Sequence, residues 1–155
     1  MIKVLIVDDS AFMRVKIRSI IESDPNMRVI GVARNGLEAV EKVKTLQPDV
    51  VTMDILMPRM SGIEAVEMIM KERPTPILLI SALTREGIND TIKALEMGAI
   101  DYIQKDQLQQ HILIEKIYTI SKGSISSGKQ KKDKQQVQNY ILPELTVNNF
   151  SIVCI

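Results

Sequence analysis

The chain is poor in cysteine, in aromatic residues and in long apolar runs, and each shortage excludes a class of protein. Its single cysteine, Cys154, rules out a disulfide framework, and no second cysteine or nearby histidine supports a metal or catalytic role for it. Tryptophan is absent and aromatic residues make up 3% of the chain, so aliphatic side chains must form the core. No stretch approaches the roughly 18 apolar residues of a membrane span, and the N-terminus lacks a signal-peptide pattern. We therefore expect no membrane insertion and a cytoplasmic location.

Net charge is also small, at +1 over 155 residues, and says little about partners. Residues 1–121 hold 15 basic and 17 acidic side chains, whereas residues 122–155 hold 5 basic and 2 acidic ones. This basic excess lacks the interleaved aromatic residues of a nucleic-acid-binding arm. We interpret it as a solvated segment and expect no nucleic-acid partner.

Short apolar runs alternate with longer amphipathic stretches along the first 121 residues. The runs are rich in Val and Ile, as in parallel strands buried on both faces, and span residues 4–7, 29–33, 50–53, 77–80 and 100–103. The stretches between them carry apolar residues at helical spacing: Phe12, Val15 and Ile20; Leu37, Val40 and Val43; Ile63, Val66 and Ile69; Ile92, Leu95 and Ala99; Leu108, Ile112, Ile117 and Ile120. This alternation predicts an α/β fold of the (βα)₅ flavodoxin-like type, a doubly wound five-stranded parallel sheet of order 2-1-3-4-5.

The composition changes after residue 121. Residues 123–138 are mostly Ser, Gly, Lys and Gln, which is typical of a flexible linker. The last five residues, SIVCI, have the pattern of a buried strand. We therefore predict one domain over residues 1–121, a linker over 122–150 and the start of a second, truncated domain over 151–155.

Polar residues stand at the ends of four of the predicted strands. Asp8 and Asp9 follow the first, Asp54 ends the third, Ser81 ends the fourth and Lys105 follows the fifth. Because ligands of such sheets bind outside the carboxyl ends of the strands, we expect these side chains to converge.

Three converging carboxylates repel one another unless a cation or a proton relieves the repulsion. Mg²⁺ suits oxygen ligands, so Asp8 or Asp9 together with Asp54, the backbone carbonyl of Leu56 and waters can complete its coordination. One carboxylate can then attack phosphorus and become an aspartyl phosphate. Lys105 would supply a fixed positive charge and Ser81 a hydroxyl donor to the phosphoryl group.

Each of these residues has a plainer interpretation when it is taken alone. The Asp-Asp-Ser sequence can be a helix N-cap, with Asp9 or Ser10 as the capping residue. An isolated Asp after a strand is usually a turn residue. The coincidence of all four strand ends favours a phosphoryl-transfer site.

The segments KVLIVDDS, DVVTMDILMPRMSGIEA, PILLISALT and GAIDYIQK resemble the receiver domain of response regulators, which has the CheY-like fold. The resemblance implies that Asp54 is the phosphoacceptor. It implies that Asp9 and Asp54 bind Mg²⁺ (or Mn²⁺) directly, Asp8 through water and Leu56 through its carbonyl. It implies that Ser81 and Lys105 contact the phosphoryl group, and that Ser81 and Tyr102 form a switch in which the ring swings inward after phosphorylation.

The chain departs from that family after Lys105, where Asp106 replaces the usual proline. A cis peptide bond before a non-proline residue costs about 3–4 kcal/mol, so the Lys105–Asp106 bond is either trans or strained. Leu56 and Leu83, two residues past Asp54 and Ser81, are poor at orienting an attacking water. We therefore expect self-dephosphorylation to take minutes or more.

The segments DSAFMR, SALTREG and ALEMGAIDYIQK are most similar to the receiver of chemotaxis protein-glutamate methylesterases (CheB). This resemblance implies a CheA-like sensor histidine kinase as phosphodonor, and a regulated effector domain or chemoreceptors as further partners. It also implies a methylesterase domain that the unphosphorylated receiver blocks, whose catalytic residues this chain does not contain. His111 is expected on the surface.

Three alternatives remain open from the sequence. A freestanding CheY-like receiver would act by protein binding only, although the linker and the final strand argue against it. A Mg²⁺-dependent phosphatase would need a second acid where Leu56 stands. A DNA-binding effector would need a helix-turn-helix, and no such pattern follows residue 121.

Overall fold

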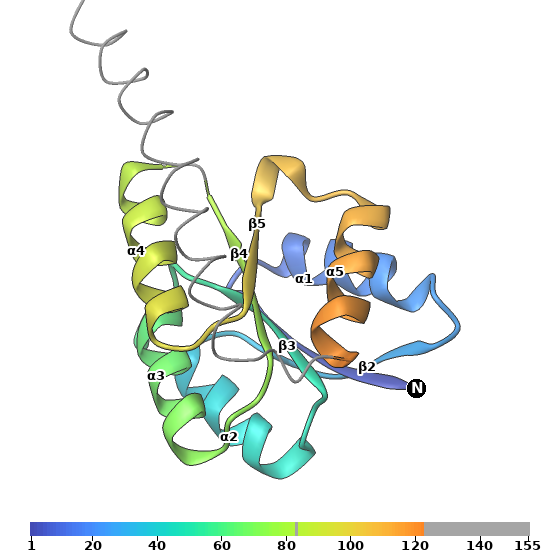
Figure 1. Cartoon of the computed structure of the whole chain (residues 1–155), viewed down its shortest axis with the longest axis horizontal. Helices are drawn as coiled ribbons and strands as arrows, with labels where there is room; N and C mark the ends of the chain where they lie inside the picture. The colour runs from blue at the N-terminus through green and yellow to red at the C-terminus, as the bar shows by residue number, and fades with distance from the viewer. Residues whose placement is uncertain (83, 123–155) are drawn as a thin grey trace, which may run out of the picture.

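The computed structural model describes residues 1–82 and 84–122. Strands and helices alternate along this part of the chain (Figure 1). The strands are β1 (Ile2–Val7), β2 (Met27–Ala33), β3 (Val50–Asp54), β4 (Ile77–Ser81) and β5 (Asp101–Gln104). The helices are α1 (Ala11–Glu22), α2 (Gly36–Leu46), α3 (Gly62–Glu72), α4 (Arg85–Glu96), the 3-10 helix η1 (Lys105–Gln107) and α5 (Gln110–Lys122).

The five strands form one parallel sheet in the order β2-β1-β3-β4-β5, which confirms the predicted fold. The chain leaves β1 towards β2 on one side, whereas β3 lies on the other, so the topological switch point falls between β1 and β3. Asp54 pairs in register with Ile80, and Ser81 with Gln104. The carboxyl ends of these strands therefore meet at one edge of the sheet, where a doubly wound fold binds its ligands.

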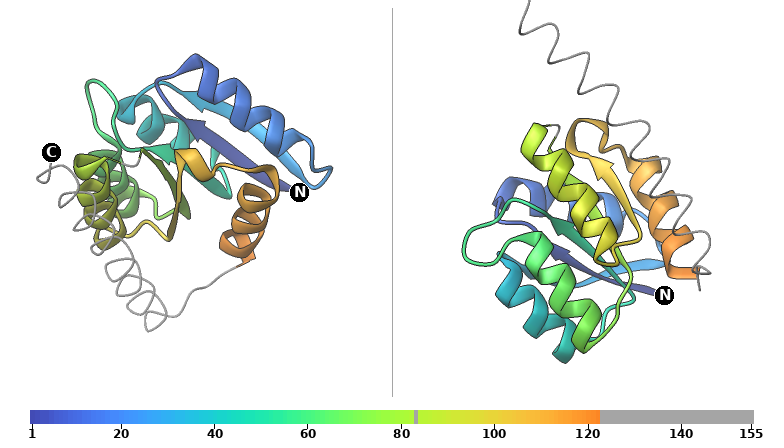
Figure 2. Two further views of the ribbon diagram at one scale, coloured as in Figure 1. Left: turned by 90° about the horizontal axis from the view of Figure 1, so that it is seen from above. Right: turned by 60° about the vertical axis from the view of Figure 1, so that its left-hand side comes forward.

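Two helical layers enclose the sheet. Helices α1 and α5 cover one face, and α2, α3 and α4 cover the other (Figures 1 and 2). Alternate residues of β1 divide between the layers, because Leu5 and Val7 pack towards α2–α4 whereas Val4 and Ile6 pack towards α1 and α5. Each fully buried aliphatic side chain stabilises the fold by roughly 1.5–3 kcal/mol, so the aliphatic core holds the strand ends rigidly.

Four helices begin at a capping side chain. The side chains of Ser10, Asn35, Ser61 and Thr84 each accept a hydrogen bond from the backbone N–H three residues further on. Such caps contribute about 1 kcal/mol each and fix the residue at which the helix starts. They therefore fix the lengths of the loops that carry the polar residues of the sheet edge.

The apolar residues whose spacing predicts α1 are not the ones that pack most closely against the sheet. Phe12 and Val15 are 75% and 70% exposed, whereas Ile17 and Ile21 are buried against the sheet. A helix turns about 100° per residue, and the pair that meets the sheet is the one spaced four residues apart.

Two other helices end earlier or start later than the apolar pattern indicates. Helix α4 ends at Glu96, before Gly98, whose φ of 125° no helix continues, so Ala99 lies beyond it. Leu108 likewise precedes α5 and is buried from the loop after η1.

No helix within the described residues is long and apolar enough to cross a membrane. Helix α5 runs to Lys122, the first residue of the predicted linker. The rest of that linker and the strand expected at residues 151–155 lie outside the described residues.

Candidate functional site

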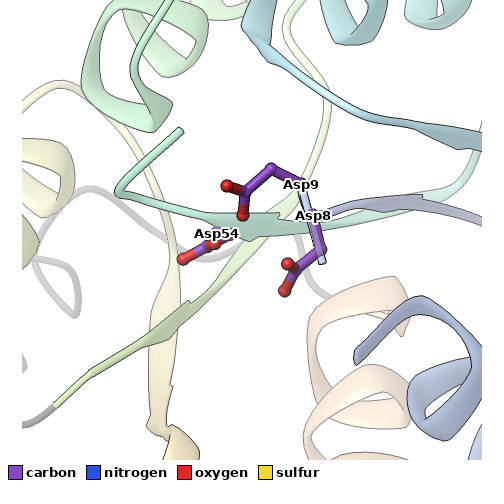
Figure 3. Close-up of side chains that lie close together, drawn as sticks. All are labelled: Asp8, Asp9 and Asp54. Atoms are coloured by element: carbon purple, nitrogen blue, oxygen red, sulfur yellow. The ribbon is translucent and has the colours of Figure 1, made fainter. Parts of the chain in front are cut away.

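Three carboxylates from two neighbouring strands meet at the carboxyl edge of the sheet. Asp8 and Asp9 follow β1, and Asp54 is the last residue of β3. One oxygen from each lies within 4.8 Å of the others, and Figure 3 shows the three side chains close together. Asp8 and Asp54 are buried while Asp9 is exposed, so the cluster opens to solvent on the Asp9 side.

A network of local hydrogen bonds holds the loop between β1 and α1. The Ser10 backbone N–H donates to Asp8 Oδ1 at 2.9 Å, and the Ser10 hydroxyl accepts from the Met13 N–H at 3.3 Å. Arg14 Nη1 donates to the Asp8 carbonyl at 2.9 Å. Ser10 is thus the N-cap of α1, as the plainer interpretation proposed, while both preceding aspartates still belong to the cluster.

Lys105 supplies the positive charge nearest to the carboxylates. Its Nζ lies 3.3 Å from Asp54 Oδ2 and 4.0 Å from Asp8 Oδ2. The Lys105–Asp106 peptide bond is trans, since the described residues contain no cis peptide bond. Aspartate in place of the family's proline therefore still delivers the ammonium group to the site.

Burial dominates the electrostatics of both inner carboxyls. Desolvation, with the charge of Asp8 added to it, raises the pKa of Asp54 to about 6, against the opposing effect of Lys105. Desolvation also raises the pKa of Asp8, although the N–H of Ser10 and the charge of Lys105 act against it. One lysine thus leaves the cluster short of positive charge.

The cluster fits a hard divalent cation. Asp8 Oδ2 is buried and makes no hydrogen bond within the described residues, although a buried carboxylate oxygen normally finds a donor. Asp54 Oδ1 accepts one hydrogen bond, from the Ile55 N–H at 2.8 Å. The donor set is all carboxylate oxygen, which suits Mg²⁺ or Mn²⁺ rather than a thiolate- or imidazole-binding metal.

The other expected site residues lie at the same edge or just behind it. Ser81 is 4% exposed and ends β4. Tyr102 is half-buried in β5, opposite Leu79, and packs on the layer that α2–α4 cover. Leu56 is 43% exposed in the loop after Asp54. His111 is exposed on α5, as expected.

Two residues of the site were not predicted from the sequence. Arg14 bonds to the Asp8 carbonyl, and a helix that begins at residue 11 already places it one turn in. Gly62 opens α3 against the backbone of Asp54, where an added Cβ would lie 2.3 Å from the Asp54 carbonyl oxygen. A glycine at the start of a predicted helix, shortly after Asp54, could have indicated that the helix approaches the Asp54 backbone closely.

Comparison with known proteins gives a consistent result. Residues 4–118 match the family described as the response regulator receiver domain. Over 104 residues the chain is 60% identical to a protein-glutamate methylesterase/protein-glutamine glutaminase of Pyrococcus horikoshii, covering 67% of this chain and 28% of that protein. Over 133 residues it is 46% identical to the protein of the same description from Halalkalibacterium halodurans, covering 86% of this chain and 38% of that one. The chain thus spans well under half of these relatives.

Two solved structures have a fold similar to that of this chain. The response regulator domain of Thermotoga maritima CheB superposes with a TM-score of 0.74 at 47% identity, covering 81% of this chain and 99% of that one. A chain of the CheX–CheY–BeF₃–Mg²⁺ complex from Borrelia burgdorferi gives a TM-score of 0.67 at 32% identity, covering 77% and 88%.

Proposed function

This chain belongs to the response regulator receiver domain family, and from that premise we propose that it accepts a phosphoryl group on Asp54 with Mg²⁺. The observation that carries the proposal is the cluster of two buried carboxylates, Asp8 and Asp54, with the exposed Asp9, and Lys105 Nζ 3.3 Å from Asp54 Oδ2. A trio of acids with one ammonium suits a site that takes up a cation and then a phosphoryl group.

In the proposed reaction an oxygen of the Asp54 carboxylate forms the new bond to phosphorus. The bond from phosphorus to the donor's imidazole nitrogen, or to the acetate oxygen of acetyl phosphate, breaks as the new one forms. Lys105 lies where its ammonium can neutralise a phosphoryl oxygen, and Ser81 can donate its hydroxyl to another. Such prearranged charges supply most of the catalysis in phosphoryl transfer.

Asp9 and Asp54 would hold Mg²⁺ directly, Asp8 through a water and Leu56 through its carbonyl. Held by these residues, Mg²⁺ would supply positive charge that offsets the charge building up on the transferring group. Support comes from the unsatisfied Asp8 Oδ2, and from the similar chain whose structure is a complex with BeF₃ and Mg²⁺.

We propose that Ser81 and Tyr102 transmit the effect of the new charge to the face of the domain formed by α4, β5 and α5. The two lie on the same side of the sheet, because Leu79 pairs with Tyr102 and precedes Ser81 by two residues. A Ser81 hydroxyl drawn towards a phosphoryl oxygen would leave room beside it for the ring. The shift is a two-state equilibrium biased by one charged group.

The phosphodonor we propose is a CheA-like histidine kinase in the cytoplasm, and the output a methylesterase domain or chemoreceptors. Support for this finer assignment is the identity of 46–60% to protein-glutamate methylesterases. A freestanding CheY-like receiver remains the alternative output.

Labelling by acetyl phosphate tests the phosphorylation. We expect the wild-type chain to gain one phosphoryl group with Mg²⁺ and none with a chelator, and Asp54→Asn to gain none. Asp106→Asn, an exposed acid beside Lys105, is the matched control and should label as wild type. Equal labelling of Asp54→Asn and wild type would contradict the proposal.

A further inference from the structure

We propose that Arg14 is a positioning residue of the acidic site, whose guanidinium orients Asp9 for cation binding. The inference rests on the proposed function, since it concerns the same cation. It assigns a role to a residue of α1 that bonds to the backbone of the site and is not among the proposed Mg²⁺ ligands.

The contact is specific. Arg14 Nη1 donates a hydrogen bond of 2.9 Å to the backbone carbonyl of Asp8, at a partly buried position. That carbonyl belongs to the peptide unit joining Asp8 to Asp9. Because the peptide unit is planar, fixing its oxygen also fixes the nitrogen and Cα of Asp9. Arg14 therefore sets the direction from which the Asp9 side chain leaves the loop.

The other contacts of the loop act elsewhere than on the carbonyl of the peptide unit that joins Asp8 to Asp9. Asp8 is held at its own N–H by the Ala33 carbonyl at 3.0 Å, and at Oδ1 by the Ser10 N–H. The Ser10 side chain is held by the hydrogen bond with which it caps α1. The Asp9 carboxylate itself makes no hydrogen bond to any residue that the structure describes. Its placement near Asp54 thus depends on the peptide units on either side of Asp9, of which Arg14 holds the first and the Ser10 N–H bond to Asp8 holds the second.

Arg14 is also anchored at its other end. Its own N–H donates to the Ser10 carbonyl at 3.0 Å, so the residue is part of the first turn of α1. A rigid helix turn and a planar guanidinium make a support with little freedom. Groups that orient metal ligands from behind typically change metal affinity by roughly 10–100-fold when they are removed.

The sign of the effect separates positioning from charge. A guanidinium near three carboxylates repels a cation, so removing its charge alone would strengthen Mg²⁺ binding. Removing a positioning group weakens Mg²⁺ binding. A residue that only stabilises the fold would lower the melting temperature and leave the Mg²⁺ affinity unchanged.

Helix α1 offers a matched control. Arg18 lies one turn further on, about half exposed, and its Nε is 3.9 Å from a Glu22 carboxylate oxygen. Arg18→Gln removes the same charge from the same helix without touching the loop. Arg14→Lys keeps the charge and one donor, and serves as the conservative variant.

Isothermal titration of the full chain with Mg²⁺ alone, paired with thermal unfolding, tests the proposal. We expect Arg14→Gln to raise the Mg²⁺ dissociation constant roughly 10-fold or more and Arg14→Lys to fall between it and wild type. Arg18→Gln should stay within about twofold of wild type, since exposed ion pairs contribute little.

An Arg14→Gln affinity equal to or tighter than wild type overturns the positioning role. If Arg14→Gln does not fold, an Arg14→Lys affinity equal to wild type overturns the need for the planar guanidinium. A wild-type chain that binds no Mg²⁺ contradicts the proposed function itself, which distinguishes the two failures.

Discussion

The Lys105 ammonium lies 3.3 Å from Asp54 Oδ2 and belongs to a different strand end from the acid it neutralises. The same ammonium is 4.0 Å from Asp8 Oδ2, so a single cation lies between two buried acids. Without a metal ion, this ammonium offsets part of the repulsion between the two acids. If Asp54 is phosphorylated as proposed, we expect the same ammonium to contact the phosphoryl group.

Replacing that lysine should separate cation binding from phosphoryl transfer. Lys105→Gln removes a charge that competes with Mg²⁺, so we expect tighter Mg²⁺ binding by titration. The same change removes a donor to the transferring group, which typically slows a reaction by roughly 100-fold. We therefore expect much slower labelling by acetyl phosphate. Labelling at the wild-type rate would show that Lys105 takes no part in the transfer.

The buried Asp54 carboxyl should make the Mg²⁺-free protein less stable as pH rises. Its pKa is raised from 3.8 to about 6, so the folded state binds the proton more tightly than the unfolded state. That stabilisation is complete below pH 3.8 and is lost as pH rises through about 6. At pH 8 the charged form costs on the order of 3 kcal/mol.

Asp54→Asn tests this account, because the amide carries no charge to bury. We expect the variant to melt at a higher temperature than wild type at pH 8 without Mg²⁺, and the difference to shrink at pH 4. Asp106→Asn, which changes an exposed acid, is the control. A variant no more stable than wild type at pH 8 would mean that Lys105 fully offsets the burial.

Gly62 should tolerate no side chain. An added Cβ would lie 2.3 Å from the Asp54 carbonyl oxygen and 2.7 Å from Ile55 Cα, and both are backbone atoms that cannot turn aside. Overpacking of this kind typically costs about 1–3 kcal/mol, so urea denaturation of Gly62→Ala should show a loss in that range.

Gly31→Ala is the comparison for that measurement. Its nearest neighbour at 2.7 Å is Leu46 Cδ1, the end of a side chain that is 38% exposed and free to move. We expect a smaller loss at Gly31. Equal losses at both positions would mean that the loss at Gly62 is not due to the Asp54 backbone.

The phosphorylated state is predicted to last minutes or more. Leu56 stands 43% exposed two residues after Asp54 and offers no group that can orient a water. Leu83, the other leucine expected to orient an attacking water poorly, lies outside the described residues. Leu56→Asn introduces an amide beside the phosphoryl group and should shorten the lifetime, measured as loss of label after removal of donor. Wild-type decay within seconds would contradict the prediction.

The sheet was predictable from sequence because its strands are buried on both faces. Residues 77–80 are all apolar and residues 50–53 are apolar except for Thr52. The observed strands differ from the predicted runs by at most two residues at either end. The convergence of Asp54, Asp8 and Lys105 followed from the topology of parallel strands alone.

Helix orientation was less predictable. Phe12 and Val15 are apolar but exposed to solvent on α1. Hydrophobicity alone did not indicate that Ile17 and Ile21 would be the residues buried against the sheet. The role of Arg14 was not predicted for a similar reason: its hydrogen bond is to a backbone carbonyl, and no sequence motif indicates such a bond. Such contacts depend on how a helix is rotated, which three-dimensional packing decides.

Locating the phosphoryl group on the chain tests the central claim most directly. After reaction with acetyl phosphate and Mg²⁺, proteolysis and mass spectrometry should find a single phosphoryl group on the peptide that contains Asp54. Hydroxylamine should remove it, because an acyl phosphate is cleaved by this reagent whereas a serine phosphate is not. A hydroxylamine-resistant group, or one on a peptide that lacks Asp54, would contradict the account.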